Sequence, residues 1–449
     1  MNRQLKADVV IIGAGPGGYR AAVTAAQRGG KVILIEREKV GGLCVNKGCI
    51  PTKALQEYLK QLAAIRKFKQ FGLKTTLAPS FSILKKRVNS VIEGIVEDMM
   101  HTVNLYGIEM IEGSGILVKQ GLVEAIEENG ARKRIECKNV VIATGSKPVK
   151  PHYLKGETIS SDELIDMEEN PESIAIIGND YEAVEIAQIL NDLGSKVTAI
   201  TSQSKFLESE DSEIAAYLQD LLTESGIEFI TNAYVIRRKD KEVNIETPEG
   251  SVKVKAEVAL STDRKPNIDG LNLEAVGIKV REGKIFVDER METNVEGIYA
   301  VGDAIGGKYA HTAFSEGIVA GDNSMGHEAF IDYSIIPRCI WTNPSIASVG
   351  LTENEAREQG YDIKITKLPF SMSGKAKIIG EGGFIKVIAD KRHNEILGVH
   401  IIGPDTCELI AEAALALKIE ATVEEVADLM HPHPTLSEIF KEASLTLKS

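Results

Sequence analysis

The sequence of 449 residues predicts an α/β fold with two Rossmann-like βαβ units and a C-terminal α+β region. Residues 7–36 combine a buried-strand run, a glycine-rich turn, a helix that ends in a Gly pair, and a second strand. A similar unit recurs at 173–201. From about residue 335 onward, strand patterns mix with amphipathic helices. The repeated βαβ unit therefore predicts two domains of the nucleotide-binding type.

The first glycine-rich turn has the pattern of a dinucleotide site. Gly13, Gly15 and Gly18 form G-x-G-x-x-G directly after a strand and at the start of a helix, and Glu36 ends the next strand. Such glycines let the backbone approach a pyrophosphate, and the helix N-terminus supplies N–H groups and a positive dipole. The acidic residue binds a ribose hydroxyl. With all these parts in register, the sequence predicts a dinucleotide site here.

Composition restricts the partners and the compartment. The net charge is −13 and the isoelectric point is about 5.3, which argues against nucleic acid or an anionic membrane as partner. No apolar run approaches the roughly 20 residues that span a bilayer. The start, MNRQLKADVVIIGAG, enters a strand-like run without the features of a signal peptide, so we expect a cytoplasmic protein.

Two of the five cysteines, Cys44 and Cys49, lie close together in GGLCVNKGCIPTKAL. In a regular helix their spacing would separate them by about 7.5 Å along the axis, whereas a disulfide needs Cα atoms about 4.4–6.8 Å apart. Gly48 and Pro51 permit the distortion that a bond would require. A strained, accessible disulfide is easily reduced, which favours a working redox pair. Two buried structural cysteines are the alternative, and no second Cys/His pair nearby supports a zinc site.

A dithiol substrate needs a proton acceptor, and HPHPTLSE offers one. His433 could accept the proton, with Glu438 orienting its imidazole and stabilising its charge. Thr435 and Glu438 also have the spacing of a capping box, so Glu438 could simply begin a helix. The spacing alone leaves both interpretations open.

These motifs together resemble the FAD-dependent pyridine nucleotide-disulfide oxidoreductases. The G-x-G-x-x-G turn with its acidic partner, C-x4-C, ATGSKP, YAVGDA and HPHPTLSEIF occur in the order of that family, over nearly the whole chain. AHTAFSEGIVAGDN, IASVGLTENEA and ILGVHIIGP look most like the dihydrolipoyl dehydrogenase branch. The chain ends in LTLKS, without the C-terminal cysteine pair expected of a mercuric reductase.

The resemblance implies that FAD occupies the first site. It implies contacts from Gly13, Gly15, Gly18, Glu36, Lys53, Gly115, Thr144, Gly145, Asp303 and Ala310. Cys49 would lie against the flavin, and Cys44 would face the dithiol substrate. His433 would be the base, with His431 supporting it. In the family this histidine reaches the disulfide of the partner subunit, so a homodimer is implied.

The resemblance also suggests how the chain is divided. We expect an FAD-binding domain with the redox disulfide, an NAD-binding-like domain, a central segment that completes the FAD site, and an interface domain that dimerises. Their expected ranges are 1–147, 148–268, 269–334 and 335–449.

The second βαβ unit should bind NAD, at a site that Gly178, Tyr181 and Glu185 would line, but its motif is degenerate. Asp180 replaces the second glycine, Glu182 follows in the first helical turn, and Asp263 replaces the glycine of the family's Gly-Arg-x-Pro-Asn stretch. The strand that should end in a ribose-binding acid ends in Thr201, and Lys205 is a single cation where a 2′-phosphate would need arginines.

An Asp at a helix N-cap takes up the N–H groups that a pyrophosphate would use. Each carboxylate within ~4 Å of a phosphate costs on the order of 1 kcal/mol even in full solvent. The alternative is that Asp180 and Glu182 only stabilise their helix. We expect NAD(H) to bind weakly or not at all.

The predicted function is oxidation of protein-bound dihydrolipoamide through Cys44, Cys49 and FAD, with electrons passing to NAD or another acceptor. The partner would be a lipoyl-bearing protein of a 2-oxoacid dehydrogenase or glycine cleavage complex. One alternative is a reductase for another small disulfide such as glutathione disulfide. Another is a flavoprotein subunit or redox sensor without turnover.

Overall fold

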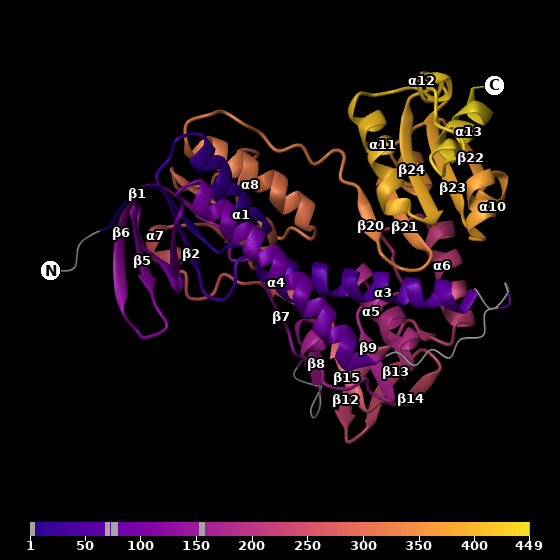
Figure 1. The fold of residues 1–449 in the computed structure, drawn as a ribbon, viewed down its shortest axis with the longest axis horizontal. Helices are drawn as coiled ribbons and strands as arrows, with labels where there is room; N and C mark the ends of the chain where they lie inside the picture. The colour runs from indigo at the N-terminus through magenta and orange to yellow at the C-terminus, as the bar shows by residue number, and fades with distance from the viewer. Residues whose placement is uncertain (1–4, 68–71, 73–79, 152–157, 449) are drawn as a thin grey trace.

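The computed structural model describes residues 5–67, 72, 80–151 and 158–448. Figure 1 shows the N-terminal sheet at one end of the molecule and the C-terminal domain at the other, with a second sheet between and below them. The predicted α/β class with two Rossmann-like units is confirmed, because each unit contains parallel strands arranged around a βαβ motif, to which the first sheet adds the antiparallel strands β4 and β5.

The first sheet has the order β3-β2-β1-β6-β5-β4, and β19 pairs with β6. Its strands are β1 (Leu5–Ile12), β2 (Val32–Glu36), β3 (Glu109–Glu112), β4 (Ser114–Lys119), β5 (Leu122–Ile126), β6 (Arg132–Ile142) and β19 (Ile298–Ala300). Because β19 joins β6, the chain returns to the first sheet after leaving it for the second. Helix α1 (Pro16–Gln27) lies beside α8 (Ala310–Ser324) on this sheet (Figure 1).

Three helices follow β2. They are α2 (Gly42–Asn46), α3 (Cys49–Lys67) and α4 (Phe81–Leu105), and the last two pack on each other. The helices expected near 51–70 and 81–105 are therefore present, although residues 68–70 lie outside the described part. Leu55, Leu59, Leu84 and Val88 form their shared core, which follows from apolar residues at helical spacing.

The second sheet is parallel, with the order β11-β10-β9-β15-β8. Its strands are β8 (Thr158–Ser160), β9 (Ser173–Ile177), β10 (Lys196–Ile200), β11 (Glu228–Ile230) and β15 (Val258–Ser261), with helices α5 (Tyr181–Asp192) and α6 (Ser212–Glu224). A separate antiparallel sheet of β12 (Tyr234–Lys239), β13 (Glu242–Thr247) and β14 (Gly250–Lys255) packs on β9. The βαβ pattern did not predict this smaller sheet.

Short elements lie between the strands of the two sheets and in the segments that join them. They are β7 (Ser146–Pro148), η2 (Ser161–Asp166), β16 (Arg264–Pro266), α7 (Leu273–Val276), β17 (Val280–Arg281), β18 (Lys284–Ile285) and the 3-10 turn η3 (Gly302–Ile305). Strands β7 and β16 pair antiparallel, so the two crossings between the nucleotide-type domains run side by side.

The C-terminal domain is an antiparallel sheet with the order β20-β21-β24-β23-β22. Its elements are β20 (Arg338–Ile340), β21 (Ser345–Gly350), α9 (Glu353–Glu358), β22 (Ile363–Pro369), η4 (Phe370–Met372), α10 (Gly374–Ile379), β23 (Phe384–Asp390), β24 (Ile396–Gly403), α11 (Thr406–Lys418), α12 (Val423–Asp428) and α13 (Glu438–Leu447). Strands β23 and β24 are buried along their whole length. Helices α11 and α13 pack on this sheet, and Ile346, Phe384 and Ile402 share a core with α6 of the second domain.

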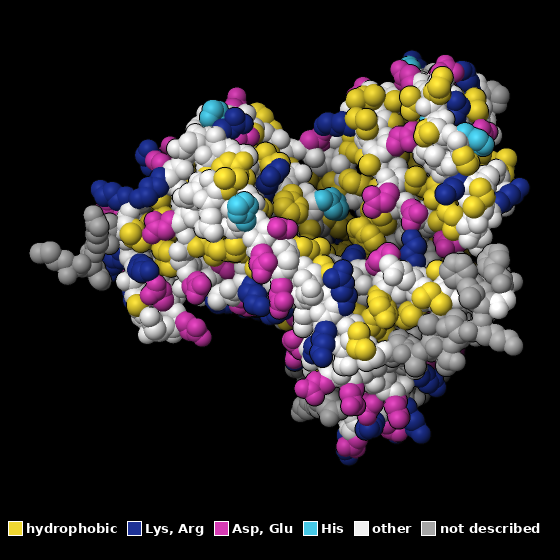
Figure 2. Space-filling model, viewed as in Figure 1, with side chains coloured by type: hydrophobic (Ala, Val, Ile, Leu, Met, Phe, Trp, Pro, Cys, Tyr) yellow, Lys and Arg dark blue, Asp and Glu magenta, His cyan; other side chains and the backbone are white. Residues whose placement is uncertain are grey.

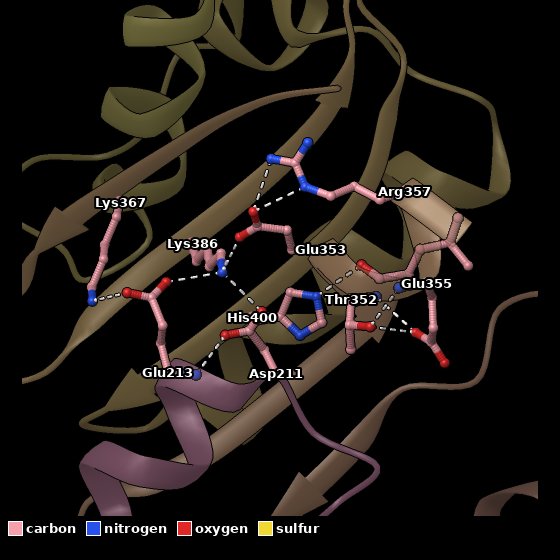
Figure 3. Close-up of polar contacts among 10 residues, drawn as sticks. Asp211, Glu213, Thr352, Glu353, Glu355, Arg357, Lys367, Lys386 and His400 are labelled. Atoms are coloured by element: carbon pink, nitrogen blue, oxygen red, sulfur yellow. Dashed lines mark hydrogen bonds and ion pairs between the residues drawn. The ribbon is translucent and has the colours of Figure 1, made fainter. Parts of the chain in front are cut away.

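A buried ion cluster joins the second domain to this sheet (Figure 3). The Lys386 ammonium on β23 is 2% exposed and lies 2.9 Å from carboxylate oxygens of Asp211, Glu213 and Glu353. Lys386 holds the pKa of the Glu353 carboxyl below its usual range. Burial lowers the pKa of the neighbouring His400 to about 4, so its imidazole is neutral and bonds Leu351 O at 2.9 Å. A cation this buried requires such partners, so the cluster fixes how the two domains meet.

Among the helices that the structure describes, none carries an apolar stretch long enough to span a lipid bilayer.

Candidate active site

A cleft of about 1790 Å³ runs between the two nucleotide-type domains. It brings together residues that the sequence assigned to both sites. From the first set it is lined by Gly13, Gly15, Glu36, Cys44, Cys49, Lys53, Gly115, Thr144, Gly145, Asp303 and Ala310, and from the second by Asp180, Tyr181, Glu182, Glu185 and Asp263. Gly18 and Gly178 lie behind the lining, where added Cβ atoms would meet Gly13 O at 1.9 Å and Thr262 Oγ1 at 2.1 Å.

The first glycine-rich turn is open toward this cleft. Gly13 has φ +102°, and a Cβ there would lie 2.3 Å from Ala143 O, so only glycine fits. Gly15 is the N-cap of α1, no side chain caps the helix, and a Cβ at Gly15 would meet nothing within 4 Å. Pro16 has no N–H, and the N–H groups that follow it in the first turn of α1 have no capping side chain, so a phosphate group could bind them.

Two further residues fit a bound dinucleotide. Glu36 ends β2 and accepts hydrogen bonds from Ala14 N at 2.6 Å and Glu38 N at 2.8 Å, which fixes its carboxylate at the edge of the cleft. The buried Thr144 Oγ1 has no hydrogen-bond partner among the described residues. A buried hydroxyl without a partner is rare, and a cofactor in the cleft would supply one. The residues present thus fit FAD.

Cys44 and Cys49 stand at a break between two helices. Cys44 lies within α2, which ends at Asn46, and Cys49 is the first residue of α3. The interruption at Lys47 and Gly48 brings the two thiols into hydrogen-bonding contact, which an unbroken helix would prevent. Both cysteines are free thiols, the reduced state of the predicted pair.

The two thiols differ in acidity. The hydrogen bond from Cys44, helped by the nearby Lys53 charge and opposed by burial, holds the pKa of the Cys49 thiol below its usual value. The same hydrogen bond, together with burial, raises the pKa of Cys44. Cys49 is therefore the sulfur that carries the negative charge when the pair loses a proton.

Lys53 is held beside the cysteines by Glu185. The Lys53 ammonium lies 2.5 Å from Glu185 Oε2 and 4.8 Å from the centre of the Trp341 ring. Glu185 Oε1 accepts the Trp341 backbone N–H at 2.9 Å, and its side chain is 3% exposed. The sequence placed Glu185 only in the second nucleotide site. In the structure Glu185 lines the shared cleft. One of its oxygens contacts Lys53 and the other accepts the backbone N–H of Trp341, the residue that follows β20.

The second glycine-rich turn is closed by its own side chain. Asp180 is the N-cap of α5, and its Oδ1 accepts Ala183 N at 3.0 Å and the Thr262 hydroxyl at 3.3 Å. Its backbone is extended, with φ −92° and ψ 179°, close to that of Gly15 at φ −67° and ψ −176°. The two turns thus share a backbone shape, and the carboxylate at the second occupies the N–H group that is open at the first.

Three carboxylates face the cleft at this turn. Burial, with Asp180 beside it, raises the pKa of Glu182 to about 7. Asp180 and Asp263 touch solvent in the cleft, yet the enclosing protein walls raise the pKa of both. Raised values mean that these carboxyl groups are poorly stabilised as anions, and a second anion nearby would add to that cost.

The other residues considered for the second site take structural positions. Thr201 is buried, and its hydroxyl accepts Gln203 N at 3.1 Å in a local turn. Thr201 and Lys205 are not among the residues that line the cleft. Tyr181 stacks on Tyr309 with ring centres 5.7 Å apart, and its hydroxyl donates to Lys308 O at 2.9 Å. Tyr181 therefore lines the cleft beside the start of α8.

His433 and Glu438 are paired, but outside the cleft. His433 Nδ1 lies 2.8 Å from Glu438 Oε1, and the imidazole is 76% exposed. Glu438 Oε2 also accepts Thr435 N at 2.8 Å, and Glu438 is the first residue of α13. The full capping box is not formed, because Ser437 is the N-cap of α13 and the Thr435 hydroxyl contacts Pro432 O and Ser437. The Thr435 amide and His433 hold the pKa of Glu438 below its usual range. The His431 side chain is 4% exposed, and its Nε2 lies 2.8 Å from Glu412 Oε1.

Sequence reasoning missed one polar chain across the cleft. Arg264 pairs with Asp162 and donates to Ser146 Oγ at 2.9 Å, and that hydroxyl donates to Asp303 at 2.5 Å. The residues come from distant segments, and no local spacing signals that they meet. Asp303, expected at the FAD site, is thereby connected to the second domain.

A close dithiol, an open phosphate-binding turn and a second βαβ unit facing one cleft define the class of FAD-dependent disulfide oxidoreductases. Comparison with known families agrees. Residues 7–317 match the pyridine nucleotide-disulphide oxidoreductase model, and residues 336–444 match the dimerisation domain of the same family. The chain belongs to the pyridine nucleotide-disulphide oxidoreductase family and is an FAD-dependent oxidoreductase, and the dimerisation domain supports a homodimer.

Curated relatives include dihydrolipoyl dehydrogenases from Bacillus subtilis, 39% identical over 98% of this chain and 97% of that protein, and from Chlamydia muridarum, 36% identical over 98% and 96%. Similar solved structures include LpdA from Mycobacterium tuberculosis, with a TM-score of 0.91, 26% identity and 99% of each chain covered. Another is the HOCl-induced flavoprotein disulfide reductase RclA from Escherichia coli, with a TM-score of 0.87, 27% identity, and 98% of this chain and 99% of that one covered.

Proposed function

We propose that the protein oxidises a dihydrolipoyl group carried on a partner protein. The observation that carries this proposal is the thiol pair Cys44–Cys49 at the wall of a cleft whose FAD-type turn is intact. Bound FAD would supply a two-electron acceptor, held by the residues of the first turn together with Glu36 and Thr144. The likeness to dihydrolipoyl dehydrogenases supports the dithiol as substrate.

The exchange begins from the oxidised pair. A substrate thiolate attacks the Cys44 sulfur, the bond between the two cysteines breaks, and Cys49 leaves as a thiolate. The second substrate thiol then attacks the mixed disulfide, so the substrate leaves as a cyclic disulfide and Cys44 takes up a proton. Cys49 suits the leaving position because a hydrogen bond and Lys53 lower its pKa.

His433 would accept the substrate proton in the partner subunit's active site. It does not line its own chain's cleft, and its exposed imidazole is already oriented by Glu438. Figure 2 shows hydrophobic side chains in a hollow between the two upper lobes, which α8 and α11 border in Figure 1. Phe314 and Ile318 of α8, and Leu415 and Ile419 of α11, are exposed, and a second copy packed against these two helices would cover them.

The physiological setting follows from the same resemblance. We propose the cytoplasm as the compartment and a 2-oxoacid dehydrogenase or glycine cleavage complex as the source of the lipoyl protein. The four segments 1–147, 148–268, 269–334 and 335–449 remain our proposed domain division. A reductase for glutathione disulfide is the second candidate, supported by the likeness to RclA, a flavoprotein disulfide reductase.

We further propose that NAD(H) binds weakly, because Asp180 occupies the amide that its counterpart Gly15 leaves open. Calorimetric titration with NADH should give a dissociation constant well above the micromolar range. Asp180→Gly combined with Asp263→Gly should tighten binding by about tenfold or more, since each carboxylate contributes on the order of 1 kcal/mol of repulsion. Asp180→Asn is the matched control: it keeps the cap but removes the charge, so its gain should be smaller.

The same titration should depend on pH. Because the pKa of Glu182 is raised to about 7, this carboxyl loses its charge as pH falls from 8 to 6. Repulsion toward a phosphate then weakens, so NADH affinity should rise on acidification, and Glu182→Gln should remove most of that rise. Micromolar affinity in the unmodified protein would contradict the proposal, and so would variants that bind no better.

A further inference from the structure

A second pair of thiols lies outside the redox site already described. Cys339 is on β20 and Cys407 is near the start of α11, and their thiols are in hydrogen-bonding contact. The Cys407 Sγ also lies 3.6 Å from Ile346 O on β21. In the β20–β21 ladder Cys339 faces Ala347, the neighbour of Ile346. The strand register therefore places Cys339 one residue along the ladder from the β21 carbonyl that Cys407 contacts.

This pair stands between two cavities. Cys339 lines the large cleft that contains Cys44 and Cys49, whereas Cys407 lines a smaller cavity of about 180 Å³. Lys53 borders both. Both cysteines are partly exposed, so a small reagent entering either cavity can reach a sulfur of the pair.

We propose that Cys339 and Cys407 form a second reversible dithiol–disulfide centre, oxidised by hydroperoxides or by small disulfides. With a hydroperoxide, Cys339 takes one oxygen and becomes a sulfenic acid while an alcohol, or water from hydrogen peroxide, is released. Cys407 then attacks that sulfur, the S–S bond forms and water leaves. With a small disulfide, two exchange steps give the same bond and two free thiols. A small dithiol reverses either reaction.

Cys339 is the better first nucleophile of the two. The hydrogen bond to Cys339, together with burial, raises the pKa of Cys407, so Cys407 keeps its proton and acts as the resolving thiol. The remaining cysteine offers a contrast. Cys137 lies on β6, and burial raises its pKa to about 12. It should stay reduced under conditions that oxidise the pair.

The second centre adjoins the first through one strand and one carboxylate. Trp341 follows Cys339 by two residues, and its N–H donates to Glu185, which holds Lys53 beside Cys49. A disulfide between Cys339 on β20 and Cys407 on α11 would therefore lie close to Trp341 and Glu185, the residues that position Lys53.

The test uses the full chain with Cys44→Ser and Cys49→Ser, which leaves Cys137, Cys339 and Cys407. The reduced protein is treated anaerobically with one equivalent of hydrogen peroxide or with glutathione disulfide, the remaining thiols are alkylated, and unreduced peptides are mapped by mass spectrometry. We expect one cross-linked peptide joining Cys339 to Cys407, two thiols lost per chain, and full recovery on adding dihydrolipoamide. Cys137 should be alkylated throughout.

Adding Cys339→Ser to this background should leave Cys407 fully alkylated after the same treatment. The proposal would be overturned if Cys339 and Cys407 both stay reactive, if either is oxidised without joining the other, or if the bond links two subunits. Should the double variant fail to fold, the same map on the unmodified protein decides the question, because the Cys44–Cys49 peptide has a different mass.

Discussion

Cys49→Ser is expected to lower the oxidation of dihydrolipoamide by at least about 10³-fold while FAD stays bound. The variant cannot form the disulfide with Cys44 that accepts the substrate's electrons. The groups that fit FAD, such as the open amides of α1, Glu36 and Thr144, do not depend on this sulfur. Turnover and the visible absorbance of the bound flavin measure the two effects separately.

Cys137→Ser is the control, because this cysteine lies on β6 and does not line the cleft, and its turnover should be unchanged. Cys44→Ala adds a test of the geometry. It removes the hydrogen bond that contributes most to lowering the pKa of Cys49, so the alkylation of Cys49 should shift to higher pH. Substantial turnover in Cys49→Ser would contradict the assigned redox pair.

His433→Gln should reduce turnover by about 10²–10⁴-fold, the contribution typical of a general acid or base. The glutamine keeps a polar side chain of similar reach but cannot accept a proton. His431→Gln is the matched control: His431 also contacts a carboxylate, that of Glu412, but its side chain is buried, so its loss should affect stability more than the chemical step. When steady-state turnover is measured as a function of pH, the profile of His433→Gln should lack one ionisation that the unmodified protein and His431→Gln both show.

Mixed dimers of Cys49→Ser and His433→Gln subunits test where the histidine acts. If each active site combines the cysteines of one subunit with His433 of the other, a mixed dimer contains one intact site, and mixing two nearly inactive proteins restores activity. If both groups act within one subunit, every site in the mixed dimer is damaged and no activity returns. The second result would contradict the proposed dimeric site.

The sequence was sufficient for the parts of the site that depend on local spacing. Gly13, Gly15 and Glu36 follow a strand–turn–helix–strand order that fixes their positions relative to one another, and all three line the cleft. The effect of Asp180 in place of a glycine could also be predicted from the sequence. A helix N-cap involves only the residues of one helical turn, so local spacing is enough to recognise it.

Contacts between distant segments could not be predicted. Lys53 and Glu185 are 132 residues apart, and hydropathy gives no reason to pair them. The cluster around Lys386 likewise appears in the sequence as one charged residue within a strand, and only the packing of α6 on the C-terminal sheet shows why it is buried. Cys339 and Cys407 looked like isolated cysteines for the same reason. Glu438 shows a further limit, because one of its oxygens orients His433 and the other accepts the Thr435 amide, yet the predicted capping box with Thr435 is not formed.

The most direct measurement is anaerobic rapid mixing of the oxidised, FAD-containing protein with dihydrolipoamide, followed through the flavin absorbance. We expect the yellow colour to be lost within the time of a single turnover. Reduced glutathione at the same thiol concentration should act far more slowly, and Cys49→Ser should stay yellow. A flavin that remains oxidised in the unmodified protein, or that is reduced equally well without Cys49, would contradict transfer through the Cys44–Cys49 pair.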